Sequence, residues 1–133
     1  MNRRYLVIAS RAKHRCEYCH APEEAFNFHF ELEHIIPASR GGADDDDNCA
    51  LACTACNLFK SDHLGAVDEV TQAQVELFHP RLQQWEDHFR ADIETGLLEG
   101  RTPTGRATIN CLRINSTAQV RARLRWIRFD LFP

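Results

Sequence analysis

Cys16-Glu17-Tyr18-Cys19 and Cys53-Thr54-Ala55-Cys56 are two Cys-x-x-Cys pairs, and the dipeptide Glu33-His34 lies between them. Four thiolates complete the tetrahedral coordination of one zinc ion and leave no open position, so the predicted zinc site is structural. The ion would join the ends of the 33 residues that separate the two pairs. Any reaction chemistry must then come from inside this joined segment, where Glu33 and His34 lie.

The alternative for the four paired cysteines is a buried thiol cluster or disulfides. The sequence begins without an apolar stretch long enough for a signal peptide, and paired cysteines without such a signal favour a metal. The separation of the pairs exceeds the roughly 15 to 20 residues of a zinc ribbon, which indicates an inserted functional loop. Cys49 and Cys111 lie outside the pairs, and we predict that they are small core residues without a ligand role.

The segment between and just after the pairs carries a linked set of motifs. It contains, in order, Glu33-His34, Pro37, Gly41-Gly42, Asn48 and, directly after the second pair, Asn57. This combination resembles the HNH endonuclease family, in the branch with a four-cysteine zinc clasp. The third signature residue is Asn57 rather than a histidine, a variant that the family tolerates. The motif region covers about residues 11–62.

The resemblance implies a ββα-metal core and a one-metal hydrolysis of phosphodiester bonds in DNA. It implies that His34 takes a proton from water as the general base. Glu33 and Asn57 would hold the catalytic Mg²⁺ or Mn²⁺, since their oxygens suit a hard cation. Asn48 would fasten the loop and orient the ring of His34, although it could instead only cap a turn. Neighbours on a strand point to opposite faces, so Glu33 and His34 could serve one phosphate only if the strand twists or ends there.

Charge is unevenly distributed along the chain. Residues 1–16 carry +5, residues 17–100 carry −14 and residues 101–133 carry +6, which gives the net charge of −3. Basic side chains that neutralise phosphates dominate affinity for nucleic acids, so the two ends are predicted to grip DNA. The alternative is that these arginines only cover helix surfaces. The predicted nucleic-acid contacts are Arg40, Lys60, Arg121 and Arg125, with a solvated helix-end lysine as the alternative for Lys60.

The remaining candidate ligands have a simpler interpretation. The other histidines lie outside any clear ligand motif and are predicted to be structural or solvated. The run 44–47 of four aspartates lacks the register and the later glutamate of a calcium loop, so we predict a solvated acidic loop. Alternation of Phe26, Phe28, Phe30 and Leu32 with mostly polar neighbours predicts a half-buried strand that runs toward Glu33.

Local signals place the other elements. Helices are expected at 5–13, from 54 to about 59, from the cap Thr102 to about 113, and from the cap Ser116 to about 128. A second strand is expected at 48–52. Residues 68–100 fit short strands or a hairpin around Gly96, alongside a helical alternative at 83–89. In the last helix, Val120, Leu124 and Ile127 are expected to face the body of the protein.

These signals together predict an α+β fold, a ββα-metal core with a zinc clasp flanked by an N-terminal helix and C-terminal helices. We expect one domain over residues 1–133, with the motif core at about 11–62 and accessory strands and helices at 63–133. The predicted function is a metal-dependent endonuclease that acts on double-stranded DNA in the cytoplasm, without membrane association, as a monomer or a homodimer. The alternatives are a catalytically inactive zinc module that binds nucleic acid or protein, and a redox or zinc sensor.

Overall fold

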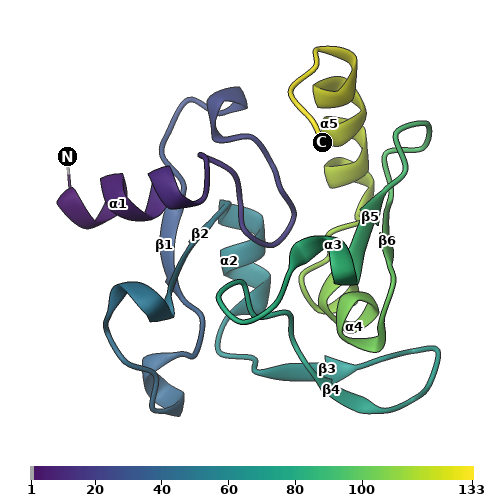
Figure 1. Ribbon diagram of the computed structural model, residues 1–133. Coiled ribbons are helices and arrows are strands. Elements are labelled where there is room, and N and C mark those ends of the chain that lie inside the picture. The colour runs from purple at the N-terminus through teal and green to yellow at the C-terminus, as the bar shows by residue number, and fades with distance from the viewer. Residues whose placement is uncertain (1) are drawn as a thin grey trace.

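A computed structural model describes residues 2–133 and contains helices together with small antiparallel sheets. Helix α1 (Arg3–Arg11) is followed by the hairpin of β1 (Glu31–His34) and β2 (Cys49–Ala52), and then by α2 (Thr54–Lys60). In Figure 1, α1 and α2 flank this hairpin, and α2 lies between it and the C-terminal elements. The mixed α and β class expected from the sequence is therefore confirmed.

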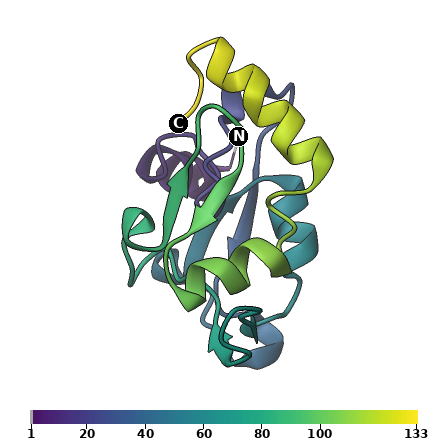
Figure 2. The ribbon, with the colours of Figure 1, turned by 90° about the vertical axis from the view of Figure 1, so that its right-hand side faces the viewer.

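The rest of the chain forms two further hairpins and three helices. Their bounds are β3 (Gly65–Val67), β4 (Gln74–Glu76), α3 (Trp85–His88), β5 (Phe89–Ala91), β6 (Leu98–Gly100), α4 (Pro103–Cys111) and α5 (Thr117–Arg128). Strand β3 pairs with β4, and β5 pairs with β6, both antiparallel. Both views place α5 at the end of the molecule opposite to β3 and β4 (Figures 1 and 2).

The register of the first hairpin decides which side chains share a face. His34 pairs with Cys49, and Glu33 pairs with Ala50. Because side chains alternate along a strand, His34 and Cys49 lie on one face, whereas Glu31 and Glu33 lie on the other. All four residues of β2 are buried, so this strand belongs to the core of the protein.

Capping signals located the two C-terminal helices correctly. The hydroxyl of Thr102 accepts a hydrogen bond from the backbone N–H of Gly105 at 3.0 Å, and Pro103 occupies the first turn of α4. The hydroxyl of Ser116 accepts from the backbone N–H of Gln119 at 3.4 Å and begins α5. These signals are local, so the sequence contained all of the information that they need.

The predicted long strand through the phenylalanines is wrong, because strand β1 begins only at Glu31. The ring of Phe26 packs instead against Phe30, with 4.9 Å between centroids, and against Trp126 of α5 at 5.9 Å. These aromatic side chains therefore belong to an irregular segment that contacts the C-terminal helix. Period-two alternation could not distinguish such a cluster from a strand.

The expected inward face of α5 is also partly wrong. Leu124 is 38% exposed, whereas Arg123 is fully buried. The guanidinium of Arg123 donates to the carbonyl oxygens of Gly96 at 2.7 Å and of Ile114 at 2.9 Å, which attaches α5 to the β5–β6 hairpin. In residues 68–100, the hairpin around Gly96 and the helical turn before it both occur.

Candidate functional site

The four paired cysteines form one buried cluster. Cys16 and Cys19 follow α1, Cys53 caps α2, and Cys56 lies in the first turn of α2. Their sulfur atoms all lie within 4.8 Å of one another, and the Sγ atoms of Cys19 and Cys53 are 3.8 Å apart. Bonds of about 2.3 Å to a tetrahedral zinc ion would also separate two sulfurs by roughly 3.8 Å. The cluster could therefore hold zinc.

The geometry of the cluster also favours a metal over disulfides. All four cysteines are free thiols, and a sulfur separation of 3.8 Å is far longer than a disulfide bond. Hydrogen bonds from Cys16, Cys19 and Cys56 hold the pKa of the Cys53 thiol well below its usual range. The same network raises the pKa of the Cys19 and Cys56 thiols. A thiolate is the form that binds a metal, so zinc would replace the protons that these thiols still carry.

His34 ends strand β1 with an accessible side chain. Its imidazole is 39% exposed, and Nε2 lies 3.0 Å from Oδ1 of Asp44 in the following loop. The same carboxylate oxygen accepts a hydrogen bond from Arg4 of α1 at 2.7 Å. Asp44 in the loop after β1 therefore links the His34 ring to the N-terminal helix.

Asn48 fastens the loop that follows His34. Its side-chain oxygen accepts from the backbone N–H of Ile36 at 2.9 Å, and its side-chain nitrogen donates to the carbonyls of Ile36 at 2.9 Å and Ala43 at 2.7 Å. A β-carbon at Gly42 would lie only 1.7 Å from the carbonyl oxygen of Ile36, so this tight closure requires glycine. The partner of the His34 ring is Asp44 rather than the predicted Asn48, and no motif in the sequence distinguished Asp44 from its acidic neighbours.

Glu33 lies on the opposite face of the strand from His34. It is 5% exposed, accepts a hydrogen bond from the hydroxyl of Tyr18 at 2.8 Å and pairs with the ammonium of Lys60. Burial raises the pKa of the Glu33 carboxyl, and the partners Lys60 and Tyr18 offset this only in part. The structure therefore does not bring Glu33 and His34 together around one exposed site.

Asn57, the other predicted cation ligand, contacts a different acid. Its side-chain amide donates to the carboxylate of Glu31 on the same face as Glu33. Glu31 was not selected from the sequence, although the period of two already places it on the side of Glu33. The side chains predicted to hold a catalytic cation are thus divided between a buried ion pair and this Glu31–Asn57 contact.

Lys60 was predicted to contact a phosphate, but it is 2% exposed. Besides pairing with Glu33, its ammonium donates to the carbonyl of Ile35 at 2.8 Å and reaches that of His34 at 3.3 Å. A buried ammonium with these partners cannot reach DNA without leaving them. The structure thus corrects the prediction, because the lysine anchors the end of β1 to α2.

The other predicted nucleic-acid contacts are exposed but lie apart. Arg40 follows the His34 loop and contacts Asp62, whose backbone carbonyl accepts from Nε at 3.1 Å. Arg121 and Arg125 are exposed on α5. Figures 1 and 2 place this helix at the opposite end of the molecule from the loop after β1. The structure does not gather these arginines into one surface around His34.

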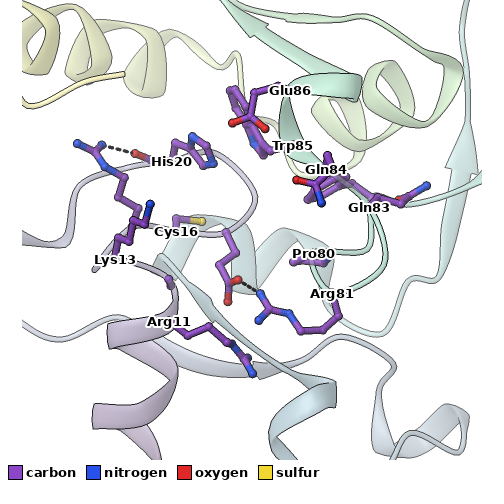
Figure 3. Close-up of a pocket in the computed structure, with 14 residues that line it drawn as sticks. Arg11, Lys13, Cys16, His20, Pro80, Arg81, Gln83, Gln84, Trp85 and Glu86 are labelled. Carbon is purple, nitrogen blue, oxygen red and sulfur yellow. Dashed lines mark hydrogen bonds and ion pairs between the residues drawn. The ribbon is translucent and has the colours of Figure 1, made fainter.

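Most of the arginines at the basic N-terminal end contact other groups of the same chain. Arg4 binds the acidic loop, and Arg11 and Arg15 donate to backbone carbonyls. Figure 3 shows the cleft of about 290 Å³ beside these residues, where Arg81 on the opposite wall pairs with Glu17. The fold thus pairs part of the predicted DNA-binding charge with its own acidic groups, and Arg11 and Lys13 are exposed cations of this cleft.

Comparison with known proteins finds a similarity for this region. Residues 16–63 match the family model of the HNH endonuclease, which confirms the resemblance over that segment. The type IV methyl-directed restriction enzyme EcoKMcrA of Escherichia coli (strain K12) is 37% identical over 54 residues, covering 38% of this chain and 20% of that protein. The chain therefore spans about a fifth of the length of this relative. No solved structure matches the chain significantly.

Among residues 2–133, no helix combines the length and the apolar character that crossing a membrane requires. The cytoplasmic location stays a prediction.

Proposed function

We propose that this chain hydrolyses phosphodiester bonds in DNA and that His34 is the general base. The observation that carries the proposal is the accessible imidazole of His34, held by Asp44 inside the segment that matches the HNH endonuclease family. A histidine ring that reaches solvent at the end of a strand can meet both a water molecule and a phosphate. An imidazole is also the side chain best suited to exchange protons near neutral pH.

Asp44 and Asn48 support this role in different ways. When the carboxylate of Asp44 accepts a hydrogen bond from Nε2–H of His34, the lone pair of the ring lies on Nδ1, which then accepts the proton from water. Asn48 keeps the loop closed through Ile36 and Ala43, so the carboxylate stays within reach of the ring. Asp44 is thus a positioning residue for His34, and Asn48 positions the loop.

Two kinds of metal belong to the proposal. Zinc in the four-cysteine cluster would hold α2 against the segment after α1 and so support the ββα-metal arrangement of β1, β2 and α2. A catalytic Mg²⁺ or Mn²⁺ would offset the charge on the phosphate oxygens. As the side chains lie, Glu33 and Asn57 do not fit one shared cation site beside His34. The requirement for Mg²⁺ or Mn²⁺ therefore rests on the resemblance alone.

The proposed substrate is double-stranded DNA, and the exposed arginines Arg40, Arg121 and Arg125 are its proposed contacts. We place all of residues 1–133 in one domain, acting as a monomer or a homodimer. The competing function is an inactive zinc module that binds nucleic acid or a protein. Glu33, His34 and Asn48 are all present, which favours the enzyme.

Nicking of supercoiled plasmid tests this function. The wild-type protein is compared with His34→Ala and with the matched control His29→Ala, which removes an exposed imidazole from before β1. Reactions contain Mg²⁺, Mn²⁺ or EDTA, and zinc content confirms that the three proteins are equally folded. We expect cleavage that requires an added divalent metal and is lost only in His34→Ala. If all three zinc-loaded proteins are inactive on double-stranded DNA, single-stranded DNA and RNA, the nuclease proposal fails and the inactive zinc module becomes the favoured function.

A further inference from the structure

A second group of metal-ligating side chains lies outside the four-cysteine cluster. Nε2 or Nδ1 of His34, a carboxylate oxygen of Asp44 and Sγ of Cys49 lie within 4.8 Å of one another. The β1–β2 register pairs His34 directly with Cys49, so both side chains leave the hairpin on the same face. The loop between the strands brings Asp44 over this face, where Nε2 and Oδ1 are 3.0 Å apart.

The donor types point to a particular class of ion. Imidazole, carboxylate and thiolate are the three ligand types of zinc, whereas Mg²⁺ takes oxygen ligands and avoids sulfur. In a tetrahedral site with bonds of about 2.0 to 2.1 Å, nitrogen and oxygen ligands lie roughly 3.3 Å apart. The 3.0 Å between His34 and Asp44 is within a few tenths of an ångström of that value.

Access and charge are also suitable. The side chain of Asp44 is 75% exposed, so an ion can enter from solvent and keep water in the fourth position. Asp44 also accepts from Arg4, but a carboxylate has enough lone pairs for both partners. Arg4 is a nearby positive charge that weakens cation binding, and the neighbouring acidic residues of the loop oppose this effect.

We propose that His34, Asp44 and Cys49 form a second metal site for Zn²⁺ or a similar borderline transition-metal ion, and that occupancy of this site switches off hydrolysis. Binding exchanges the thiol proton of Cys49 for the metal and releases that proton to solvent. This proposal departs from the prediction that Cys49 has no ligand role. The binding part stands on the geometry alone, whereas the inhibition rests on the proposed function.

Inhibition follows from the protons of the imidazole ring. A neutral imidazole has one N–H and one lone pair. A metal bound to Nε2 uses that lone pair and requires the proton on Nδ1. Neither nitrogen of His34 can then accept a proton from water, whichever of the two serves as the base.

Cobalt binding tests the site without any measurement of activity. Co²⁺ is added to protein whose four-cysteine cluster is filled with zinc, and the thiolate-to-cobalt charge-transfer absorption is recorded together with the zinc content. We expect the wild type and the matched control Cys111→Ala to bind one cobalt per chain with this absorption and to retain zinc. We expect Cys49→Ala to lose the absorption. The proposal would be overturned if the wild type lacked the charge-transfer absorption. It would also be overturned if Cys49→Ala kept the absorption because cobalt displaced zinc from the four-cysteine cluster.

Zinc inhibition of plasmid nicking in Mg²⁺ tests the functional part. Each protein is compared with its own activity without added zinc. We expect Cys49→Ala to require at least about 10-fold more zinc than the wild type for half-inhibition, in keeping with the loss of one of three ligands. Equal sensitivity of the two proteins would overturn the inhibitory role. If no protein cleaves DNA, the proposed function fails while the cobalt result still decides the metal site.

Discussion

Glu33 and His34 are neighbours in the chain, yet their side chains lie on opposite faces of β1. Glu33 is buried against Lys60, and His34 is open to solvent beside Asp44. The alternation of a regular strand enforces this separation, since the pairing with β2 continues through both residues. The acidic member of the pair therefore stabilises the core, while the histidine is available for chemistry.

Replacement of Lys60 by methionine should destabilise the protein strongly. The substitution leaves the buried carboxylate of Glu33 without its counter-ion, and breaking a buried pair on one side costs about 3 to 5 kcal/mol. Urea unfolding measures the loss. Lys13→Met, at an exposed lysine, should change the free energy of unfolding by less than about 0.5 kcal/mol. The double substitution Lys60→Met with Glu33→Gln should recover part of the loss, and no recovery would argue against the pair as its cause.

Replacement of Asp44 by asparagine should lower kcat for DNA cleavage roughly 10-fold, the lower end of the effect of removing a hydrogen-bond partner that orients a functional histidine. KM should change little, since the residue acts through His34. The control is Asp47→Asn, which removes the same charge from the same loop without a contact to the ring. An equal effect of both substitutions would show that only the charge of the loop matters.

Loss of one cysteine of the cluster should remove the structural ion. Cys56→Ser should bind less than one zinc per chain and should unfold at a clearly lower temperature, because metal binding free energy contributes directly to folding in small domains. Cys111→Ser, outside the cluster, should keep both zinc and stability. Metal analysis combined with thermal unfolding makes this comparison, and zinc retained by Cys56→Ser would contradict the four-thiolate site.

Glu23 should make stability depend on acidic pH. Burial alone would raise the pKa of its carboxyl, but hydrogen bonds from Tyr5, His14 and the backbone N–H of Phe30 lower it overall. The ionised Glu23 carboxylate therefore contributes its full stabilisation above the pKa of the unfolded chain, about 4.3. This stabilisation is lost as the pH falls through the lower pKa of the folded protein. Glu23→Gln should cost about 1 to 3 kcal/mol at neutral pH. Urea unfolding of both proteins from pH 7 downward should show this difference narrowing below the unfolded pKa, and a constant difference would contradict the shift.

The buried Arg123 should matter for stability, whereas its exposed neighbour Arg121 should not. Arg123→Ala leaves the carbonyls of Gly96 and Ile114 without their donor, at a cost of about 3 kcal/mol. Arg121→Ala should stay within about 0.5 kcal/mol of the wild type. Amide hydrogen exchange should then increase in the β5–β6 hairpin only for Arg123→Ala. Unchanged exchange there would show that the arginine does not attach α5 to the hairpin.

Short-range signals predicted much of the fold. Some elements depend on residues within a few positions of each other and could be predicted from the sequence. They are the helix caps at Thr102 and Ser116, the second strand and the helix after Cys53. The alternation of phenylalanines was misleading, since the ring of Phe26 packs with Trp126, which is about 100 residues away. Long-range packing of this kind leaves no periodic signature.

By itself, the sequence predicted the four-cysteine cluster and the resemblance of residues 16–63 to the HNH endonuclease family, and it made His34 a candidate site residue. Ligand spacing and motif order are properties of the chain, so these features could be recognised without coordinates. Only the tertiary structure decided that Lys60 is buried, that Asp44 meets His34 and that Cys49 joins them. The strand register sets which side chains share a face, and the loop closure sets which acid reaches the ring. Both depend on contacts between residues distant in sequence, which neither composition nor local pattern specifies.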